Sequence, residues 1–178
     1  MKKAAIVIII TAAIIGCKSG PTQQVSSVVA AVPSPSTVLA TGYVTDEANV
    51  IDESTRKQLE STLAALQKRR TIDFSVVTVK STGDTSVFDY SLALARERKK
   101  KSIVVNVSGL LLLVAVDDRQ WRVQITRNLE PHLTNETLTN MSTPMTDAFR
   151  QKQYGEGIRK YVNAIIEKLD QLDLQGQV

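Results

Sequence analysis

The chain has few of the residues on which disulfides, metal centres and large aromatic cores depend. Its 178 residues include one cysteine, one histidine and five prolines, and aromatic residues make up 4% of the total. A single cysteine excludes a disulfide framework within one chain, and one cysteine with one histidine excludes a zinc site with four such ligands. The length is sufficient for one domain of ordinary size and too short for two large ones.

A strong excess of charge of either sign is also missing. The 22 basic residues face 18 acidic ones, for a net charge of +4, and without Lys2 and Lys3 the balance is 20 against 18, or +2. Nucleic-acid-binding domains ordinarily carry a marked basic excess on one face. The sequence therefore predicts that nucleic acid is not a partner.

The amino terminus has the pattern of an export signal. Lys2 and Lys3 precede a charge-free run over residues 4–16 (AAIVIIITAAIIG), which ends at Cys17. This run is shorter than the roughly 20 apolar residues that cross a bilayer, so it is typical of a cleaved signal peptide. Residues 14–17 (Ile-Ile-Gly-Cys) resemble the bacterial lipobox. The resemblance implies that residues 1–16 are a lipoprotein signal peptide and that acylated Cys17, now the first residue, holds the protein on a membrane.

The residues after Cys17 predict a tether and a location. Residues 17–42 comprise the cysteine whose lipidation the lipobox resemblance implies and a segment rich in Ser, Thr, Pro and Gln. That segment has neither helical nor alternating periodicity, which indicates a flexible linker. A coil of about 25 residues spans on the order of 25 to 30 Å. Lys18, rather than Asp, follows the cysteine. The lipobox resemblance then implies the cell envelope, at the outer membrane facing the periplasm if the host has two membranes.

Residues 43–170 carry the periodic patterns of one folded domain, with 171–178 as a C-terminal tail. The spacing predicts helices over about 53–70, 87–100 and 134–141 and from 143 to an apolar stripe ending at Leu169, with strands over 72–79, 110–116 and 121–126. This order predicts an α/β (α+β) sandwich. Its small mixed sheet contains a parallel crossover and an antiparallel hairpin and is flanked by helices.

Three segments resemble the TPM domain family in their order and spacing. They are residues 43–51 (YVTDEANVI), residues 109–119 (GLLLLVAVDDR) and Leu129-Glu130. The resemblance covers about residues 43–170 and implies the TPM fold. Members of the family have been described as weak acid phosphatases, as binders of Ca²⁺ or another divalent cation, and as factors that assemble or repair membrane complexes.

The chain departs from the family pattern at several polar and glycine positions. The family's Asp-Asn-Gly before the central strand falls on residues 107–109 (Val-Ser-Gly), and its later glycines and acidic residue fall on Thr126, Asn128 and Asn135. A hard cation needs several oxygen ligands, preferably anionic, and phosphoryl transfer needs compensating positive charge. These losses favour a non-catalytic interaction or accessory module that works with an envelope protein partner.

Asp46, Glu47 and Glu130 remain as candidate metal ligands, and Asp46 and Glu130 as candidate catalytic residues. They would serve the alternative function, a weak divalent-cation-dependent acid phosphatase, or else a structural Ca²⁺-binding module. We expect the loop before the first helix and the loop after the hairpin to meet at one end of the sheet. The other interpretation is local turn chemistry, which is also the preferred account of Asp117 and Asp118.

Basic residues cluster where the helix over 87–100 is predicted to end. The cluster, in the segment RERKKK, contains Arg96, Arg98, Lys99, Lys100 and Lys101. Favourable interaction with the negative end of the helix dipole is one explanation. Contact with anionic lipid headgroups or with an acidic partner is the other.

Overall fold

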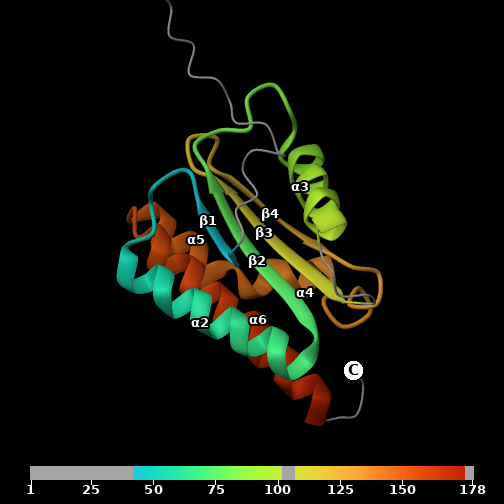
Figure 1. Cartoon of the computed structure of the whole chain (residues 1–178). Helices are drawn as coiled ribbons and strands as arrows, with labels where there is room; N and C mark the ends of the chain where they lie inside the picture. Colours follow the sequence, from blue (N-terminus) through green and yellow to red (C-terminus); the bar gives the residue numbers. More distant parts are fainter. Residues whose placement is uncertain (1–41, 102–106, 175–178) are drawn as a thin grey trace, which may run out of the picture. The chain divides into compact units, whose positions relative to one another are not determined.

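The computed structural model describes residues 42–101 and 107–174 (Figure 1). The predicted signal peptide, Cys17 and most of the linker lie outside these residues. The described elements are β1 (Val44–Asp46), α2 (Glu53–Arg70), β2 (Ile72–Val79), α3 (Val87–Lys101), β3 (Ser108–Ala115), β4 (Gln120–Ile125), α4 (Asn135–Met141), α5 (Thr143–Arg150) and α6 (Tyr154–Leu174). None of the described helices is both long and apolar enough to span a bilayer.

The strands form one mixed sheet in the order β1-β2-β3-β4. β1 pairs with β2 and β2 with β3 in parallel, with Val44 opposite Val76 and Ile72 opposite Ser108. β3 and β4 form an antiparallel hairpin in which Ala115 lies opposite Gln120. α3 is the crossover between the parallel strands β2 and β3. The predicted α+β fold, with its parallel crossover and hairpin, is confirmed.

Helices bury both faces of this sheet (Figure 1). α2, α4, α5 and α6 share one core with one face of the sheet, and α3 covers the other face with a smaller core. The leucines of α2 that enter the larger core, Leu59, Leu63 and Leu66, recur at helical spacing. Because both faces of β2 and β3 are covered, their residues are apolar in nearly continuous runs rather than in strict alternation.

β1 is a strand that the sequence pattern did not predict. It contributes only three residues, pairing with Val76, Val77 and Thr78, and three residues are too few to show a period of two. Asp46 is therefore the last residue of a strand, and only Glu47 lies in the loop before α2.

The C-terminal helices also differ in their limits from the predicted ones. Two helices, α5 from Thr143 to Arg150 and α6 from Tyr154, occupy the region from residue 143 onward, and Ser142 is the capping residue of α5. α6 continues to Leu174, beyond the predicted domain limit at residue 170, so residues 171–174 are helical.

The direction of the parallel strands defines two opposite sides of the molecule, one at which these strands end and one at which they begin, and we call them edges. β1, β2 and β3 all end at one side, and we call residues 46–51, 80–86 and 116–119 the carboxyl edge. The amino edge, at the opposite side, comprises residues 42–43, 68–73, 96–101, 107–109 and 126–130. The last segment lies there because β4 runs antiparallel to β3: the N–H of Thr126 donates to the carbonyl of Gly109, 3.0 Å away.

Candidate functional site at the carboxyl edge

Asp46 is fixed at the carboxyl edge by three hydrogen bonds. Its carboxylate accepts the backbone N–H groups of Val50 (3.1 Å) and Ile51 (2.9 Å) and the hydroxyl of Thr78 in β2. The side chain thus closes the loop between β1 and α2 and fastens that loop to the sheet. The geometry matches the turn interpretation of this residue.

Asp118 fastens the turn after β3 to the loop after β2. Its carboxylate accepts the Ser81 hydroxyl (2.7 Å), the Thr82 N–H (2.8 Å) and the Thr82 hydroxyl (3.1 Å). The Thr82 N–H and then the Ser81 hydroxyl hold the pKa of Asp118 below its usual range, because each stabilises the ionised form. The N–H of Asp117 donates to the carbonyl of Lys80 (2.8 Å), so the backbone of the turn after β3 is also bonded to the loop after β2.

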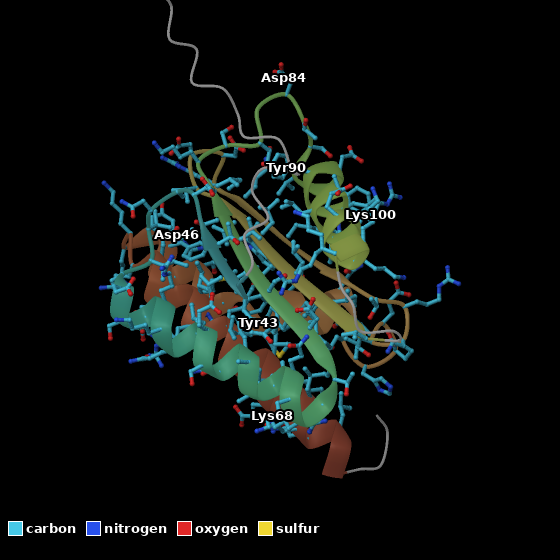
Figure 2. The ribbon with its side chains drawn as sticks, in the orientation of Figure 1. Tyr43, Asp46, Lys68, Asp84, Tyr90 and Lys100 are labelled. Carbon is cyan, nitrogen blue, oxygen red and sulfur yellow. The ribbon has the colours of Figure 1, made fainter. Side chains whose placement is uncertain are left out.

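Three further carboxylates at this edge face solvent. Glu47, Asp84 and Asp117 are exposed, and Figure 2 shows Asp84 at the tip of the loop between β2 and α3. Glu47 also acts on Tyr90 of α3, whose pKa is raised first by burial and then by the Glu47 charge. Within residues 42–101 and 107–174, no three His, Cys, Asp or Glu side chains lie close enough to hold a metal ion.

Glu130 lies at the amino edge, away from Asp46 and Glu47. β4 starts at Gln120, opposite Ala115 at the end of β3, and ends at Ile125, opposite Leu110 near the start of β3. Glu130 comes five residues after the end of β4. β2 has eight residues, so at about 3.3 Å per residue the two edges are roughly 20 to 25 Å apart. The expectation that the three carboxylates meet at one end of the sheet is wrong, because an antiparallel partner delivers the chain to the end at which the parallel strands begin.

The basic cluster of α3 also lies at the amino edge, and its members differ in their contacts. Arg98 forms a bidentate pair with Asp73 of β2 (2.9 and 2.8 Å) and donates to the carbonyl of Gly42 (3.0 Å). Lys100 pairs with Glu97 in the same helix. Arg96, Lys99 and Lys101 are exposed and make no ion pair within the described part of the chain.

A groove of about 450 Å³ opens beside this cluster, between α3 and the β3–β4 hairpin. Its walls are largely apolar, and they also include three basic side chains, one of which is Arg98. The lining includes Leu92, Ala95, Leu111 and Ile125, together with Arg96 and Lys99.

Residues 44–168 of the chain match the family model of the TPM domain. The chain belongs to the TPM-domain family. The N-terminal domain of a P. gingivalis protein is 31% identical, with a TM-score of 0.66 over 78% of this chain and 88% of that one. No curated protein matches.

Two more distant structures share the TPM fold. The BA42 protein of the psychrophilic bacterium Bizionia argentinensis is 15% identical, with a TM-score of 0.57 over 68% of this chain and 82% of its own. The N-terminal domain of the Corynebacterium glutamicum protein cg2496 is 14% identical, with a TM-score of 0.51 over 71% of this chain and 79% of its own.

Most of the departures from the TPM pattern gather at the amino edge of this TPM domain. The side-chain amide of Asn128 donates to the Ser108 hydroxyl, and the N–H of Gly109 donates to the Thr126 hydroxyl (3.0 Å). Neutral groups therefore bond to one another where the family pattern places an amide and glycines. Glu130 is exposed beside them.

One further positioning residue, Glu60 of α2, was not predicted from the sequence. Its carboxylate accepts the backbone N–H groups of Tyr43 (3.1 Å) and Val44 (2.8 Å), so it holds the first residues of the TPM domain against the helix. A glutamate on the polar face of an amphipathic helix is usually solvated, and nothing in the local pattern distinguishes this one.

Proposed function

We propose that the protein is an envelope lipoprotein whose TPM domain binds a partner protein without catalysing a reaction. In this proposal acylated Cys17 holds the chain on the membrane, at the periplasmic face of the outer membrane in a host with two membranes. The residues that follow it present the domain as an accessory module for an envelope complex.

One observation carries this proposal: Asp46 fastens the loop after β1 to β2, and Asp118 fastens the turn after β3 to the loop after β2. A binding surface made of loops gains affinity when its loops are already ordered, because less conformational entropy is lost on association. The same bonds occupy these two carboxylates. The surface left facing solvent carries Glu47, Asp84 and Asp117, which suit a partner with a basic segment.

The alternative, a divalent-cation-dependent phosphatase, receives less support from the geometry. It requires Asp46 and Glu130 to hold one ion, and the two lie at opposite edges of the sheet. A structural Ca²⁺ site needs several oxygen ligands around one point. The carboxylate of Asp46 is already engaged by two loop amides and a hydroxyl.

Site-specific photo-crosslinking in the native cell tests the binding proposal. A photoreactive residue at Glu47 or at Asp117 should capture the same envelope protein, and one at the exposed Ala64 of α2 should not. When the photoreactive residue is placed at Asp84 instead, the paired change Glu47→Lys and Asp117→Lys should abolish capture of that protein. Equal capture from all positions, or none from the carboxyl edge, would contradict the proposal.

Two further measurements test the anchor and the absence of catalysis. Cys17→Ser should abolish incorporation of labelled fatty acid, and continued labelling would show that another residue carries the lipid. The purified protein should not hydrolyse a generic phosphomonoester. A hydrolytic activity that is lost on addition of a chelator, and is also lost in the Asp46→Asn variant, would identify an enzyme instead.

A further inference from the structure

We propose that the amino edge is a membrane-docking surface, on which exposed basic residues of α3 and the groove beside them contact an anionic phospholipid bilayer. The inference rests on the anchored state proposed above. It adds an orientation: the amino edge faces the lipid, and the carboxyl edge faces away toward the partner.

Charge is concentrated at this edge. Residues 96–101 contain five basic residues and one acidic residue, for a net +4. The rest of the chain after Lys3 then contains 15 basic and 17 acidic residues, for a net −2. The helix dipole explains why the last turn of a helix is basic. It does not explain why the basic excess of the whole chain is concentrated in this one segment.

Much of this charge is available to a ligand. Arg98 is committed to Asp73 and to the Gly42 carbonyl. Arg96, Lys99 and Lys101 are exposed without an ion pair in the described part of the chain, and Lys68 and Arg127 are exposed at the same edge. Figure 2 shows Lys68 near the end of α2 and Lys100 on α3.

The groove supplies the apolar component that bilayer contact requires. Leu92, Ala95 and Ile125 line it, and Arg96 and Lys99 stand with them. Apolar side chains flanked by basic ones are the combination that binds the boundary between headgroups and acyl chains. A small polar anion would gain no binding energy from contact with the apolar walls.

The tether leads to the same edge. Arg98 of α3 binds the carbonyl of Gly42, so the chain toward Cys17 starts beside the basic cluster. The 24 residues from Lys18 to Thr41 are predicted from composition to be a flexible linker, and a coil of that length would span roughly 25 to 30 Å. An anchor at Cys17 therefore keeps this edge within reach of the bilayer, and docking loses little further translational freedom.

Vesicle binding by a chain without the anchor tests the proposal independently of lipidation. Ala31–Val178 forms a compact unit, and its described residues contain the sheet and the helices on both faces, so a protein that begins at Ala31 keeps the domain. It should co-sediment with vesicles of phosphatidylcholine mixed with phosphatidylglycerol and not with pure phosphatidylcholine. Binding should weaken at about 1 M salt, where the screening length is about 3 Å.

Matched charge variants locate the surface. Arg96→Gln, Lys99→Gln and Lys101→Gln combined should weaken vesicle binding on the order of a hundredfold, at about fivefold for each basic residue near an anionic surface. The control is Lys57→Gln, Lys80→Gln and Arg150→Gln, all exposed and outside the amino edge, with the same change in net charge. It should bind nearly as the parent does.

Three results would overturn the proposal. Equal losses in both triple variants would show attraction to net charge alone. Equal binding to both kinds of vesicle would show that anionic lipid is not recognised. Absence of vesicle binding, together with binding of an oligoglutamate peptide that the α3 variant abolishes, would assign the surface to an acidic protein. These vesicle results do not depend on lipidation of Cys17, because the protein tested begins at Ala31. Failure of the anchor proposal and failure of the docking proposal can therefore be told apart.

Discussion

At the level of single residues, neighbouring aspartates of the carboxyl edge have different roles. Asp118 accepts three hydrogen bonds from Ser81 and Thr82, whereas the adjacent Asp117 is exposed. The difference follows from the β3–β4 turn, which directs one side chain toward the loop after β2 and the other into solvent. A carboxylate that accepts several donors stabilises the fold only while it is ionised.

Asp118→Asn should therefore destabilise the protein in a pH-dependent way. Its lowered pKa means that Asp118 stabilises the fold above the unfolded value of about 3.9, and this contribution is lost as pH falls through the folded pKa. Near neutral pH we expect a loss of about 1 to 2 kcal/mol from weakened charge-assisted bonds.

Urea unfolding at several pH values measures this effect. The difference between the parent and the Asp118→Asn variant should shrink as pH falls below about 4. Asp117→Asn is the matched control and should leave stability unchanged. A pH-independent difference for Asp118→Asn would mean that the bonds do not depend on charge.

At the level of elements, α6 depends on close contacts with the helices before it. Gly157 lies where an added Cβ would come 2.9 Å from the Met145 carbonyl oxygen and 3.1 Å from the Ala148 Cβ, both in α5. Gly155, two residues earlier, has no atom nearer than 3.5 Å to the same position. The glycine at 157 is thus required by packing, and the one at 155 is not.

Gly157→Ala should lower the free energy of unfolding by about 1 kcal/mol or more, because overpacking outweighs the gain in helix propensity. Gly155→Ala should raise it by about 0.5 kcal/mol, since alanine loses less backbone entropy in a helix. Thermal unfolding of both variants compares the effects directly. A stabilised Gly157→Ala variant would show that α5 moves aside at little cost.

Tyr161 joins α6 to α4 and to the sheet. Its buried hydroxyl donates to the Leu138 carbonyl (2.9 Å), and its ring meets that of Trp121 in β4 edge to face at 5.6 Å between centroids. Burial raises the pKa of Tyr161, so the hydroxyl stays protonated and remains a donor.

Tyr161→Phe should cost about 1 to 2 kcal/mol, because the buried Leu138 carbonyl loses its partner while the ring contact with Trp121 is kept. Tyr154→Phe is the control: it removes a hydroxyl from the same helix and keeps the ring contact with Phe149. Chemical denaturation of both variants gives the comparison. Equal stabilities would show that water replaces the lost donor.

At the level of the whole molecule, the two faces of the sheet are unequally stabilised. Within the described residues, the core shared with α2 and α6 has 22 buried apolar members and the core under α3 has seven. Since stabilisation scales with buried apolar area, α3 should be the first large element to open. This is the helix that carries the proposed docking surface.

Native-state hydrogen exchange should show lower opening free energies for α3 amides than for those of α2, β2 and α6. Asp73→Asn weakens the pair with Arg98, which is only partly exposed, and should lower protection in α3 more than in the larger core. Uniform protection across all helices would contradict this prediction and would mean that the sheet and both layers open together.

Much of the architecture follows from local patterns. Leu59, Leu63 and Leu66 at helical spacing behind the capping residue Asp52 predict α2. The apolar run over residues 110–115 predicts a central strand, and the alternation after Trp121 predicts its hairpin partner. β1 escaped prediction because three paired residues carry no periodicity, and its pairing with β2 depends on contacts remote in the chain.

The candidate site was less predictable than the fold. The family motifs identified Asp46 and Glu130, but spacing along the chain does not indicate the end of the sheet at which a loop emerges. That was decided by the direction of each strand: β1 ends where β2 ends, and β4 ends where β2 begins.

The sequence by itself determined the helices, the long strands, the predicted anchor at Cys17 and the family. Each of these depends on short-range periodicity or on a contiguous motif. Only the tertiary structure decided that the acidic loops and the basic end of α3 lie at opposite edges, that Asp46 bonds to Thr78 of β2, and that Asp118 bonds to the loop after β2. The reason is physical: backbone pairing between distant segments sets strand direction, and strand direction decides which side chains meet.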